Sequence, residues 1–383
     1  MFKYKRKSGL AIGAVLLAMG LHAQETGPWR SGILVDEFVY EEADFPSCHA
    51  ATIAETPQGL VIAFFGGTRE RNPDVEIRLS RQVDGQWTAP VSVADGVIND
   101  TLRYPTWNPV LYQVPDGELQ LYYKVGPRPA EWWGMVKTSS DGGQTWSDAR
   151  KLPEGYIGPV KNKPVLLTNG NLVSPSSKEG DGGWRLHVEI SGDNGQTWRQ
   201  VGPLDFGADD LRAIQPSILD HGNGKLQMLA RSRNRVLAQA WSNDYGETWS
   251  PLEKSALPNN NSGTDAVTLA DGRHALVYNH VLPPGDLAKG PRTPLHLSIS
   301  KDGVNWDAAL ILEDSPISQY SYPSIIQTED GLLHVVYTWR RQRIKHVVID
   351  PDKLKLKRIR NGVWPALKGY TAPEPLAENE EDN

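Results

Sequence analysis

The chain of 383 residues holds 46 Asp and Glu against 40 Lys and Arg, which gives a formal net charge of −6 at pH 7. This acidic balance argues against nucleic acid or an anionic membrane surface as the main partner. Cys48 is the only cysteine, so no internal disulfide can form, and stability must come from side-chain burial and closure of the fold.

The first 23 residues have the features of a secretory signal peptide. Four Lys and Arg residues lie within residues 3–7, an uncharged stretch covers 10–21, and Leu-His-Ala at 21–23 offers a cleavage site. We therefore expect export to the periplasm or beyond. We expect no membrane insertion, because no later apolar run approaches the roughly 20 residues that span a bilayer. Residues 24–363 are expected to form one domain, and the tail of residues 364–383, which ends in "ENEEDN", is expected to be disordered.

Six hairpin signatures follow one another along the mature chain. In each, two alternating apolar runs flank a glycine turn, and the six glycines are at 59, 117, 170, 224, 272 and 331. A third strand such as "MVKTSS" or "LHLSIS" follows each hairpin, and a turn with a weaker fourth strand comes after it, except in the last unit, where no Asp turn and no fourth strand follow "RIKHVVID". Four strands in a repeat of roughly 50 residues predict an all-β fold, a six-bladed β-propeller of four-stranded antiparallel blades. The segment around "GILVDEFVY" is expected to complete the last blade and close the ring.

A recurring octet joins the third and fourth strands of these units: "SSDGGQTW" at 139–146, "SGDNGQTW" at 191–198 and "SNDYGETW" at 242–249. Its Asp can accept hydrogen bonds from N–H groups of its own turn, its Gly permits a positive φ, and its Trp folds back as an apolar plug. Degenerate copies occur as "DGQW" at 84–87 and "DGVNW" at 302–306, and a structural turn tolerates such sequence variation more easily than an active site does. We therefore interpret the octets as structural.

These octets resemble the Asp-boxes of the sialidase superfamily, and residues 30–350 are similar to a six-bladed member of it. The resemblance implies that the boxes lie on the face away from the active site. Strand geometry locates the working face independently. Because consecutive strands are antiparallel, residues that enter the first strand, leave the second or enter the third should lie at one mouth of the propeller channel.

Basic and aromatic side chains are prominent at this predicted mouth, which indicates an anionic ligand. Arg69, Arg231 and Arg340 are expected to approach one point from three blades, and their planar guanidinium groups suit a carboxylate. The alternative for any single Arg is an ion pair between blades. The other predicted substrate-binding residues are Lys124, Lys161, Lys163, Asn108, Trp107, Trp133, Gln215 and His280. A solvated lysine pair at 161 and 163, a core position for Trp107 and a structural contact for His280 are the competing interpretations.

The sialidase resemblance also implies residue roles. Sialidases bind the sugar carboxylate with three Arg, use a Tyr paired with a Glu as nucleophile, and use an Asp as acid/base. "FFGGTRERNPDVEIRLSR" and "MLARSRNR" resemble two of their Arg segments, which implies carboxylate binding by Arg69 and Arg231. "YSYPSII" resembles the nucleophile segment, which implies that role for Tyr322.

Three positions depart from the sialidase pattern. His49 stands where an Arg is expected, Gln215 where the Glu is expected and Asn108 where the Asp is expected. Neither amide can transfer a proton as a carboxyl group does, so other residues must do so. The predicted candidates are His49, Asp74, Asp265 and His280. Basic surroundings favour a neutral His49 that can act as a base, and a half-buried histidine bonded to the backbone is its alternative.

Three functions follow from these patterns. The first is an exported exo-glycosidase that removes a terminal acidic sugar from an oligosaccharide or polysaccharide. The second is a lyase or unusual hydrolase of uronic-acid linkages, in which His49 abstracts a proton and Tyr322 protonates the leaving group. The third is a glycan-binding propeller without catalysis. We expect a monomer without cofactor or metal, because no motif for a cofactor and no ligand spacing for a metal is present.

Overall fold

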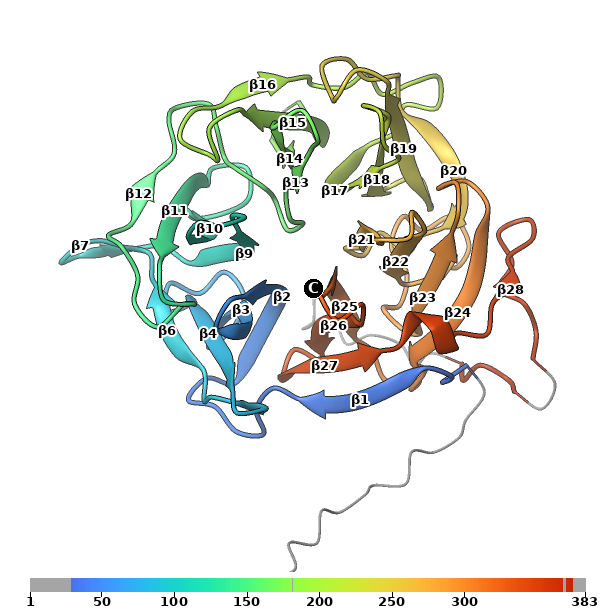
Figure 1. Ribbon diagram of the computed structural model, residues 1–383, viewed down its shortest axis with the longest axis horizontal. Coiled ribbons are helices and arrows are strands. Elements are labelled where there is room, and N and C mark those ends of the chain that lie inside the picture. Colours follow the sequence, from blue (N-terminus) through green and yellow to red (C-terminus); the bar gives the residue numbers. More distant parts are fainter. Residues whose placement is uncertain (1–28, 181, 368–369, 375–383) are drawn as a thin grey trace, which may run out of the picture.

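Six antiparallel sheets stand around one central axis in the computed structural model, which describes residues 29–180, 182–367 and 370–374 (Figure 1). The prediction of an all-β, six-bladed propeller is confirmed. The predicted signal peptide lies outside the described residues. Among those residues no helix is long and apolar enough to cross a membrane.

The first three blades follow the chain order. Blade 1 consists of β2 (Ser47–Thr56), β3 (Gly59–Gly67), β4 (Glu76–Val83), β5 (Gln86–Trp87) and β6 (Val91–Ala94). Blade 2 consists of β9 (Thr106–Gln113), β10 (Leu119–Val125), β11 (Trp133–Ser139) and β12 (Arg150–Lys151). Blade 3 consists of β13 (Val165–Leu166), β14 (Leu172–Lys178), β15 (Arg185–Ser191) and β16 (Arg199–Val201). A small hairpin of β7 (Val97–Asn99) and β8 (Leu102–Arg103) lies between the first two.

The last three blades complete the ring. Blade 4 consists of β17 (Ala213–Asp220), β18 (Leu226–Ser232), β19 (Val236–Ser242) and β20 (Glu253–Pro258). Blade 5 consists of β21 (Asp265–Thr268), β22 (His274–Tyr278), β23 (Leu295–Ser300), β24 (Trp306–Glu313) and β28 (Lys357–Arg358). Blade 6 consists of β25 (Tyr320–Gln327), β26 (Leu333–Trp339), β27 (Arg343–Ile349) and β1 (Ile33–Phe38). One 3-10 turn, Pro351–Lys353, precedes β28.

The N-terminal segment closes the ring as the sequence predicts. Strand β1 pairs antiparallel with β27, with Asp36 opposite Val347 and Phe38 opposite Lys345. The outermost strand of blade 6 therefore comes from the start of the described residues, while its three inner strands come from near their end (Figure 1). Such pairing leaves no open edge between the two ends of the propeller.

Packing of blade against blade forms the core. All seven residues of the second strand of blade 4, Leu226–Ser232, are buried, as are all seven of Leu119–Val125 in blade 2. One apolar cluster joins the facing surfaces of blades 5 and 6, with Val277 and Leu297 packed against Val335 and Tyr337. Because both faces of each blade are covered, the middle strands are apolar along most of their length.

The Asp octets form closed turns between the third and fourth strands. Asp141 Oδ1 accepts hydrogen bonds from the N–H groups of Gln144 and Thr145, each at 2.9 Å, and its Oδ2 accepts one from the Thr145 hydroxyl at 2.6 Å. These hydrogen bonds lower the pKa of Asp141 to about 2. Asp193 repeats the pattern in the next blade. Every acceptor site of these carboxylates serves its own turn, as the structural interpretation requires.

The ordered chain continues past residue 363, where the sequence analysis placed the end of the domain. The Trp364 ring lies 4.1 Å from that of His296 and 5.5 Å from that of Trp29. Tyr370 donates a hydrogen bond to Asp314 at 3.2 Å. The prediction of a disordered tail from residue 364 is therefore wrong for this part, because its aromatic side chains pack on blade 5. Residues 375–383 lie outside the described part.

Candidate functional site

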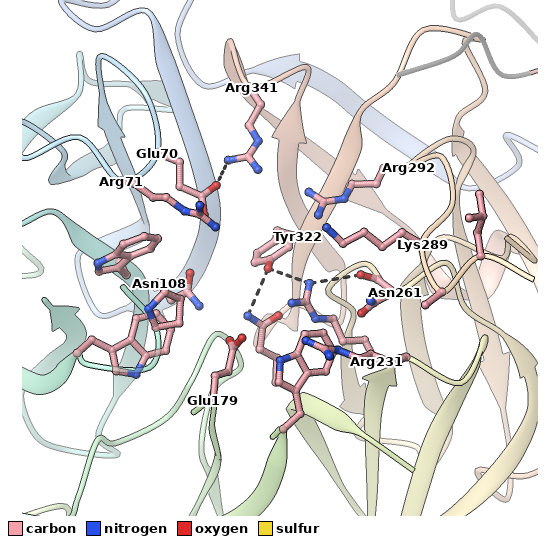
Figure 2. Close-up of a pocket in the computed structure, with 18 residues that line it drawn as sticks. Glu70, Arg71, Asn108, Glu179, Arg231, Asn261, Lys289, Arg292, Tyr322 and Arg341 are labelled. Atoms are coloured by element: carbon pink, nitrogen blue, oxygen red, sulfur yellow. Dashed lines mark hydrogen bonds and ion pairs between the residues drawn. The ribbon is translucent and has the colours of Figure 1, made fainter. Parts of the chain in front are cut away.

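A cavity of about 580 Å³ opens at one face of the propeller, at the ends of all six blades (Figure 2). Each loop between a second and a third strand contributes to its lining: Glu70 and Arg71, Pro129 and Trp132, Glu179 and Trp184, Arg233, Leu287 to Lys289 with Arg292, and Arg341. The Asp turns join the third strands to the fourth and so lie at the opposite edge of the blades. The mouth predicted from strand alternation is the one that contains the cavity.

The innermost strands add a ring of side chains below these loops. Asn108, Gln215, Asn261 and Tyr322 line the cavity, and all four have a positive φ, between 35° and 63°. Ala50 and Lys161 hold the equivalent positions in the other two blades, with φ of 58° and 77°. In blades 1, 4 and 6 the strand register shifts at this position, which is the mark of a β-bulge. At Gln215 and Tyr322 the bulged residue directs its side chain into the cavity, and Asn108 in blade 2 lies at a similar register shift.

Tyr322 lies at the centre of this ring (Figure 2). Its hydroxyl oxygen accepts hydrogen bonds from Arg231 Nη1 at 2.9 Å and from Gln215 Nε2 at 3.3 Å. Three cations surround its ring: the guanidinium carbons of Arg231 and Arg292 lie 5.5 and 5.6 Å from the centroid, and Lys161 Nζ lies at 5.7 Å. Basic side chains therefore lie on several sides of the Tyr322 ring.

The lining is strongly basic although the whole chain is acidic. Six Arg and Lys side chains face two Glu side chains: Arg71, Arg231, Arg233, Lys289, Arg292 and Arg341 against Glu70 and Glu179. Trp184 orders two of the cations, because the guanidinium carbons of Arg231 and Arg233 lie 5.2 and 4.3 Å from its ring. An anionic group is thus the ligand that this cavity favours.

Only one member of the predicted arginine triad lines the cavity. Arg231 does, but Arg69 is exposed outside the lining, and Arg71 takes its place two residues on. Arg340 turns away and binds the Tyr320 and Ser315 hydroxyls, each at 3.1 Å. The neighbouring Arg341 enters the cavity instead. The predicted convergence of Arg69 and Arg340 on Arg231 is therefore corrected to Arg71, Arg292 and Arg341, which line the cavity with it.

The two carboxyl groups of the cavity have opposite pKa shifts. Burial alone would raise the pKa of Glu70, but the charge and the hydrogen bond of Arg341, in contact at 2.5 Å, together with the charges of Arg292 and Arg71, outweigh it and lower that pKa. Burial raises the pKa of Glu179, against the opposing charge of Arg231 and a hydrogen bond from Trp184. Two carboxyl groups whose environments separate their pKa values in this way suit one proton donor and one proton acceptor.

His49 lies behind Tyr322 and does not line the cavity. It is 2% exposed, its ring centroid is 4.1 Å from that of Tyr322, and its Nδ1 is 2.9 Å from the Thr338 hydroxyl. Burial, followed by the charges of Arg341 and Arg292, holds the pKa of His49 well below its usual range. The ring is neutral, as the sequence analysis expected, but its contact is with Tyr322 and a threonine hydroxyl.

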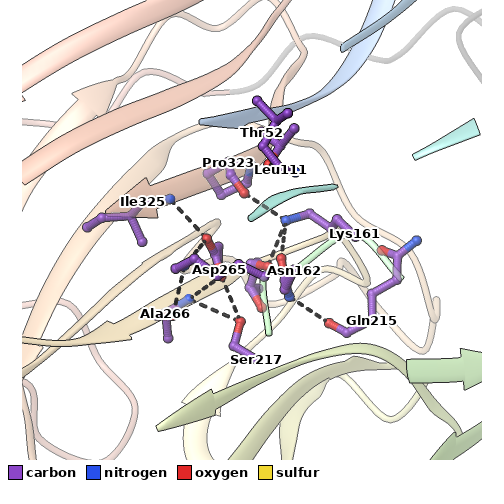
Figure 3. Close-up of polar contacts among 12 residues, drawn as sticks. Thr52, Leu111, Lys161, Asn162, Gln215, Ser217, Asp265, Ala266, Pro323 and Ile325 are labelled. Carbon is purple, nitrogen blue, oxygen red and sulfur yellow. Dashed lines mark hydrogen bonds and ion pairs between the residues drawn. The ribbon is translucent and has the colours of Figure 1, made fainter. Parts of the chain in front are cut away.

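Asp265, a predicted acid/base, is fully buried in the wall between blades (Figure 3). Its carboxylate accepts hydrogen bonds from the Ser217 hydroxyl at 3.0 Å and from the Ile325 N–H at 2.9 Å. Lys163 pairs with it at 2.8 Å. Lys161 Nζ, above, binds the carbonyl oxygens of Thr264 at 2.8 Å and Pro323 at 2.7 Å. Neither lysine lines the cavity, and these three side chains hold blades 3, 4, 5 and 6 together below it.

The remaining predicted residues divide between the cavity and its surroundings. Trp107, Asn108 and Gln215 line it, and Trp107 donates to the Gly126 carbonyl at 2.8 Å. Four do not line it. The Asp74 carboxylate accepts hydrogen bonds from the Thr68 N–H and hydroxyl, and Lys124 is buried against the Pro159 carbonyl. His280 forms hydrogen bonds with Tyr278 and Gly362, and Trp133 faces a neighbouring cavity. For the first three the structure favours structural contacts over the predicted roles, whereas Trp133 lines the neighbouring cavity instead of this one. Among the described residues, no group of His, Cys, Asp and Glu side chains is placed to hold a metal ion.

The sequence relationships agree with this architecture. The model of the BNR repeat-like domain matches residues 58–335, more than half of the chain. The chain belongs to this family. With its six blades it is a BNR propeller of the sialidase superfamily.

Known proteins similar to this BNR propeller differ in what they act on. The anhydrosialidase of Macrobdella decora is 23% identical over 261 residues, which are 60% of this chain and 33% of that protein, so the chain spans one third of that relative's length. The NanB sialidase from Streptococcus pneumoniae superposes with a TM-score of 0.61 at 12% identity, over 84% of this chain and 71% of that one. The α-L-arabinanase of Penicillium chrysogenum, complexed with arabinobiose, also gives 0.61, at 18% identity over 84% and 99%. These identities show a shared fold.

The sequence analysis missed several lining residues of this BNR propeller. Glu70, Arg71, Trp184, Lys289, Arg292 and Arg341 line the cavity without having been predicted. Three of them, Glu70, Arg71 and Arg341, lie directly beside or two residues from a predicted arginine, in "TRER" and "WRRQ". Each of these turns holds more than one charged residue, and only the turn geometry decides which one faces inward. Arg292 lies in a long loop between β22 and β23, where no strand pattern fixes a direction.

Proposed function

We propose that this protein is an exported glycoside hydrolase that removes a terminal acidic sugar from a glycan. The observation that carries the proposal is the basic cavity around Tyr322, in which six cations and two glutamates meet at the mouth of the propeller. Resemblance to anhydrosialidase and the fold shared with NanB sialidase and with an arabinanase support a glycan-degrading enzyme. The acidic sugar and the export are this proposal's own additions.

The carboxylate of the sugar binds between Arg231, Arg292 and Arg341. All three line the cavity, and Arg231 and Arg292 also lie within 5.6 Å of the Tyr322 ring centroid. Guanidinium groups bind carboxylates through paired hydrogen bonds, which fixes the orientation of the sugar as well as its charge. This arrangement places the anomeric carbon, next to the carboxylate or across the ring from it, near the Tyr322 oxygen.

Glu179 and Glu70 divide the proton transfers. Glu179, whose pKa is raised, donates its proton to the glycosidic oxygen as the bond to the anomeric carbon breaks. Glu70, whose pKa is lowered, accepts a proton from the water that adds to that carbon. The Tyr322 oxygen, held by Arg231 and Gln215, stabilises the positive charge that develops at the anomeric centre.

The test is product analysis with a variant. The purified protein is incubated with 3′-sialyllactose and with an oligosaccharide that ends in glucuronate, while reducing sugar and near-ultraviolet absorbance are recorded. We expect reducing sugar without absorbance from at least one substrate. Glu179→Gln is expected to lower the rate about 10²- to 10⁴-fold, and less on aryl glycosides whose leaving group needs no proton. Glu247→Gln, an exposed carboxylate on the Asp-turn side, serves as the control.

Two other outcomes decide against the proposal. An unsaturated product that absorbs in the near ultraviolet would indicate a lyase. Saturable binding without any product would indicate a glycan-binding propeller. If hydrolysis is observed but its rate does not change in Glu179→Gln, the proposed reaction stands and the role of Glu179 as proton donor is refuted.

A further inference from the structure

A second cavity adjoins the first. It has a volume of about 310 Å³ and lies between blades 2 and 3. Pro129, Trp132 and Glu179 line both cavities. The remaining walls are Trp133 and the segment that connects β12 to β13, residues 151–157. The two cavities are therefore neighbours, with the Glu179 side chain at their common boundary.

The chemistry of the second cavity differs from that of the first. Its aromatic walls are Trp132, Trp133 and Tyr156. It holds fewer cations than the first cavity, Lys151 and Lys178, and Glu154 and Glu179 line it with them. Aromatic faces with a few polar groups are typical of sites for uncharged organic ligands.

Two contacts hold this cavity in shape. Lys178 Nζ donates a hydrogen bond to the Gly155 carbonyl at 2.9 Å, which ties the 151–157 segment to the end of β14. Lys151 Nζ lies 5.1 Å from the ring centroid of Trp133, and the Tyr104 ring supports the same indole at 5.9 Å. The indole is thus fixed while it remains half-buried at the cavity wall.

We propose that the second cavity binds the sugar on the leaving side of the scissile bond, and that this sugar is uncharged. The inference rests on the proposed function. A proton donor to the glycosidic oxygen must lie beside that oxygen, and Glu179 lies where the two cavities meet. With the acidic sugar in the basic cavity, the chain beyond the bond enters the aromatic one. There Trp133 and Tyr156 offer ring faces for stacking.

This subsite is tested by calorimetric titration of the Glu179→Gln protein, in which hydrolysis is suppressed, with four sugar probes. The probes are N-acetylneuraminic acid and glucuronic acid alone, and 3′-sialyllactose and a glucuronate-terminated disaccharide. We expect the longer probe to bind more tightly than its acidic monosaccharide. Adding Trp133→Ala to this protein should lower its affinity for the longer probe roughly threefold to tenfold and leave its affinity for the monosaccharide unchanged. Tyr156→Ala, in a loop, gives an independent second variant. Trp241→Ala is the control, because this half-buried indole in blade 4 lines neither cavity.

The outcomes separate this inference from the function on which it rests. If neither monosaccharide binds, both the proposed function and the subsite are overturned. Only the subsite is overturned if a monosaccharide binds but the longer probe binds no more tightly than that monosaccharide. The same conclusion follows if the longer probe binds more tightly and this difference persists in both Trp133→Ala and Tyr156→Ala. A melting temperature within a few degrees of the parent confirms that a variant is folded.

Discussion

Replacing Asp265 with alanine separates a catalytic role for this residue from a structural one. The carboxylate is fully buried and accepts from Ser217, from the Ile325 N–H and from Lys163, at 3.0, 2.9 and 2.8 Å. Its removal leaves a largely buried ammonium group and two donors without acceptors. Breaking a buried ion pair costs about 3 to 5 kcal/mol. Because the Lys163 side chain keeps 16% exposure, water recovers part of this, and we expect a loss of about 3 kcal/mol in the free energy of unfolding.

Urea unfolding followed by tryptophan fluorescence measures this loss, with Asp74→Ala as the control. Asp74 is exposed and serves only the Thr68 turn, so its removal should cost less than about 1 kcal/mol. Turnover of the substrate that the parent hydrolyses is then measured for the same two variants, under conditions in which both are folded. Unchanged stability together with lost turnover in Asp265→Ala would refute the structural reasoning and restore Asp265 as an acid/base.

Two further predictions concern the cavity and the response to pH. Arg231→Lys keeps the charge but loses the 2.9 Å bond to Tyr322 and the stacking on Trp184, so affinity for the acidic monosaccharide should fall about 10- to 100-fold. Arg185 stacks on Phe206 outside the cavity, so Arg185→Lys should not change that affinity. Equal losses of affinity in both variants would contradict the assignment of Arg231 to carboxylate binding. His280 is held neutral because burial lowers its pKa to about 4, whereas the unfolded chain binds a proton below about 6.5. The free energy of unfolding should therefore fall as pH drops from 6.5 toward 4, and His280→Gln should make that fall, measured by urea unfolding at pH 7 and 5, less steep.

The repeat pattern was sufficient to predict the architecture. Hairpins, third strands and Asp turns recur at a spacing that only a propeller explains, and apolar alternation fixes the faces of each strand. The pairing of β1 with β27 followed from a missing fourth strand in the last unit. The working mouth followed as well, because antiparallel alternation puts every loop between a second and a third strand at one edge.

The identity of the lining residues could not be predicted in the same way. Arg340 and Arg341 are consecutive and both have a positive φ, 52° and 59°, so strand alternation does not extend through their turn. Arg340 donates its N–H to Gln319, and the Arg341 carbonyl accepts from Cys48, which fixes the turn between blades 6 and 1. Only this tertiary contact directs Arg341 toward Glu70 and turns Arg340 away.

The inner ring explains why the departures from the sialidase pattern leave the fold intact. Asn108, Gln215 and Tyr322 each precede a proline and each have a positive φ. For residues other than glycine that conformation costs about 1 to 2 kcal/mol, and it persists because the bulges and neighbouring blades impose it. The backbone therefore aims whichever side chain stands at these positions into the cavity. A change from carboxyl to amide at 108 or 215 then alters the chemistry without altering the scaffold. In the proposed reaction the proton transfers are assigned to groups on the loops above, where Glu70 and Glu179 are the two carboxyl groups that line the cavity.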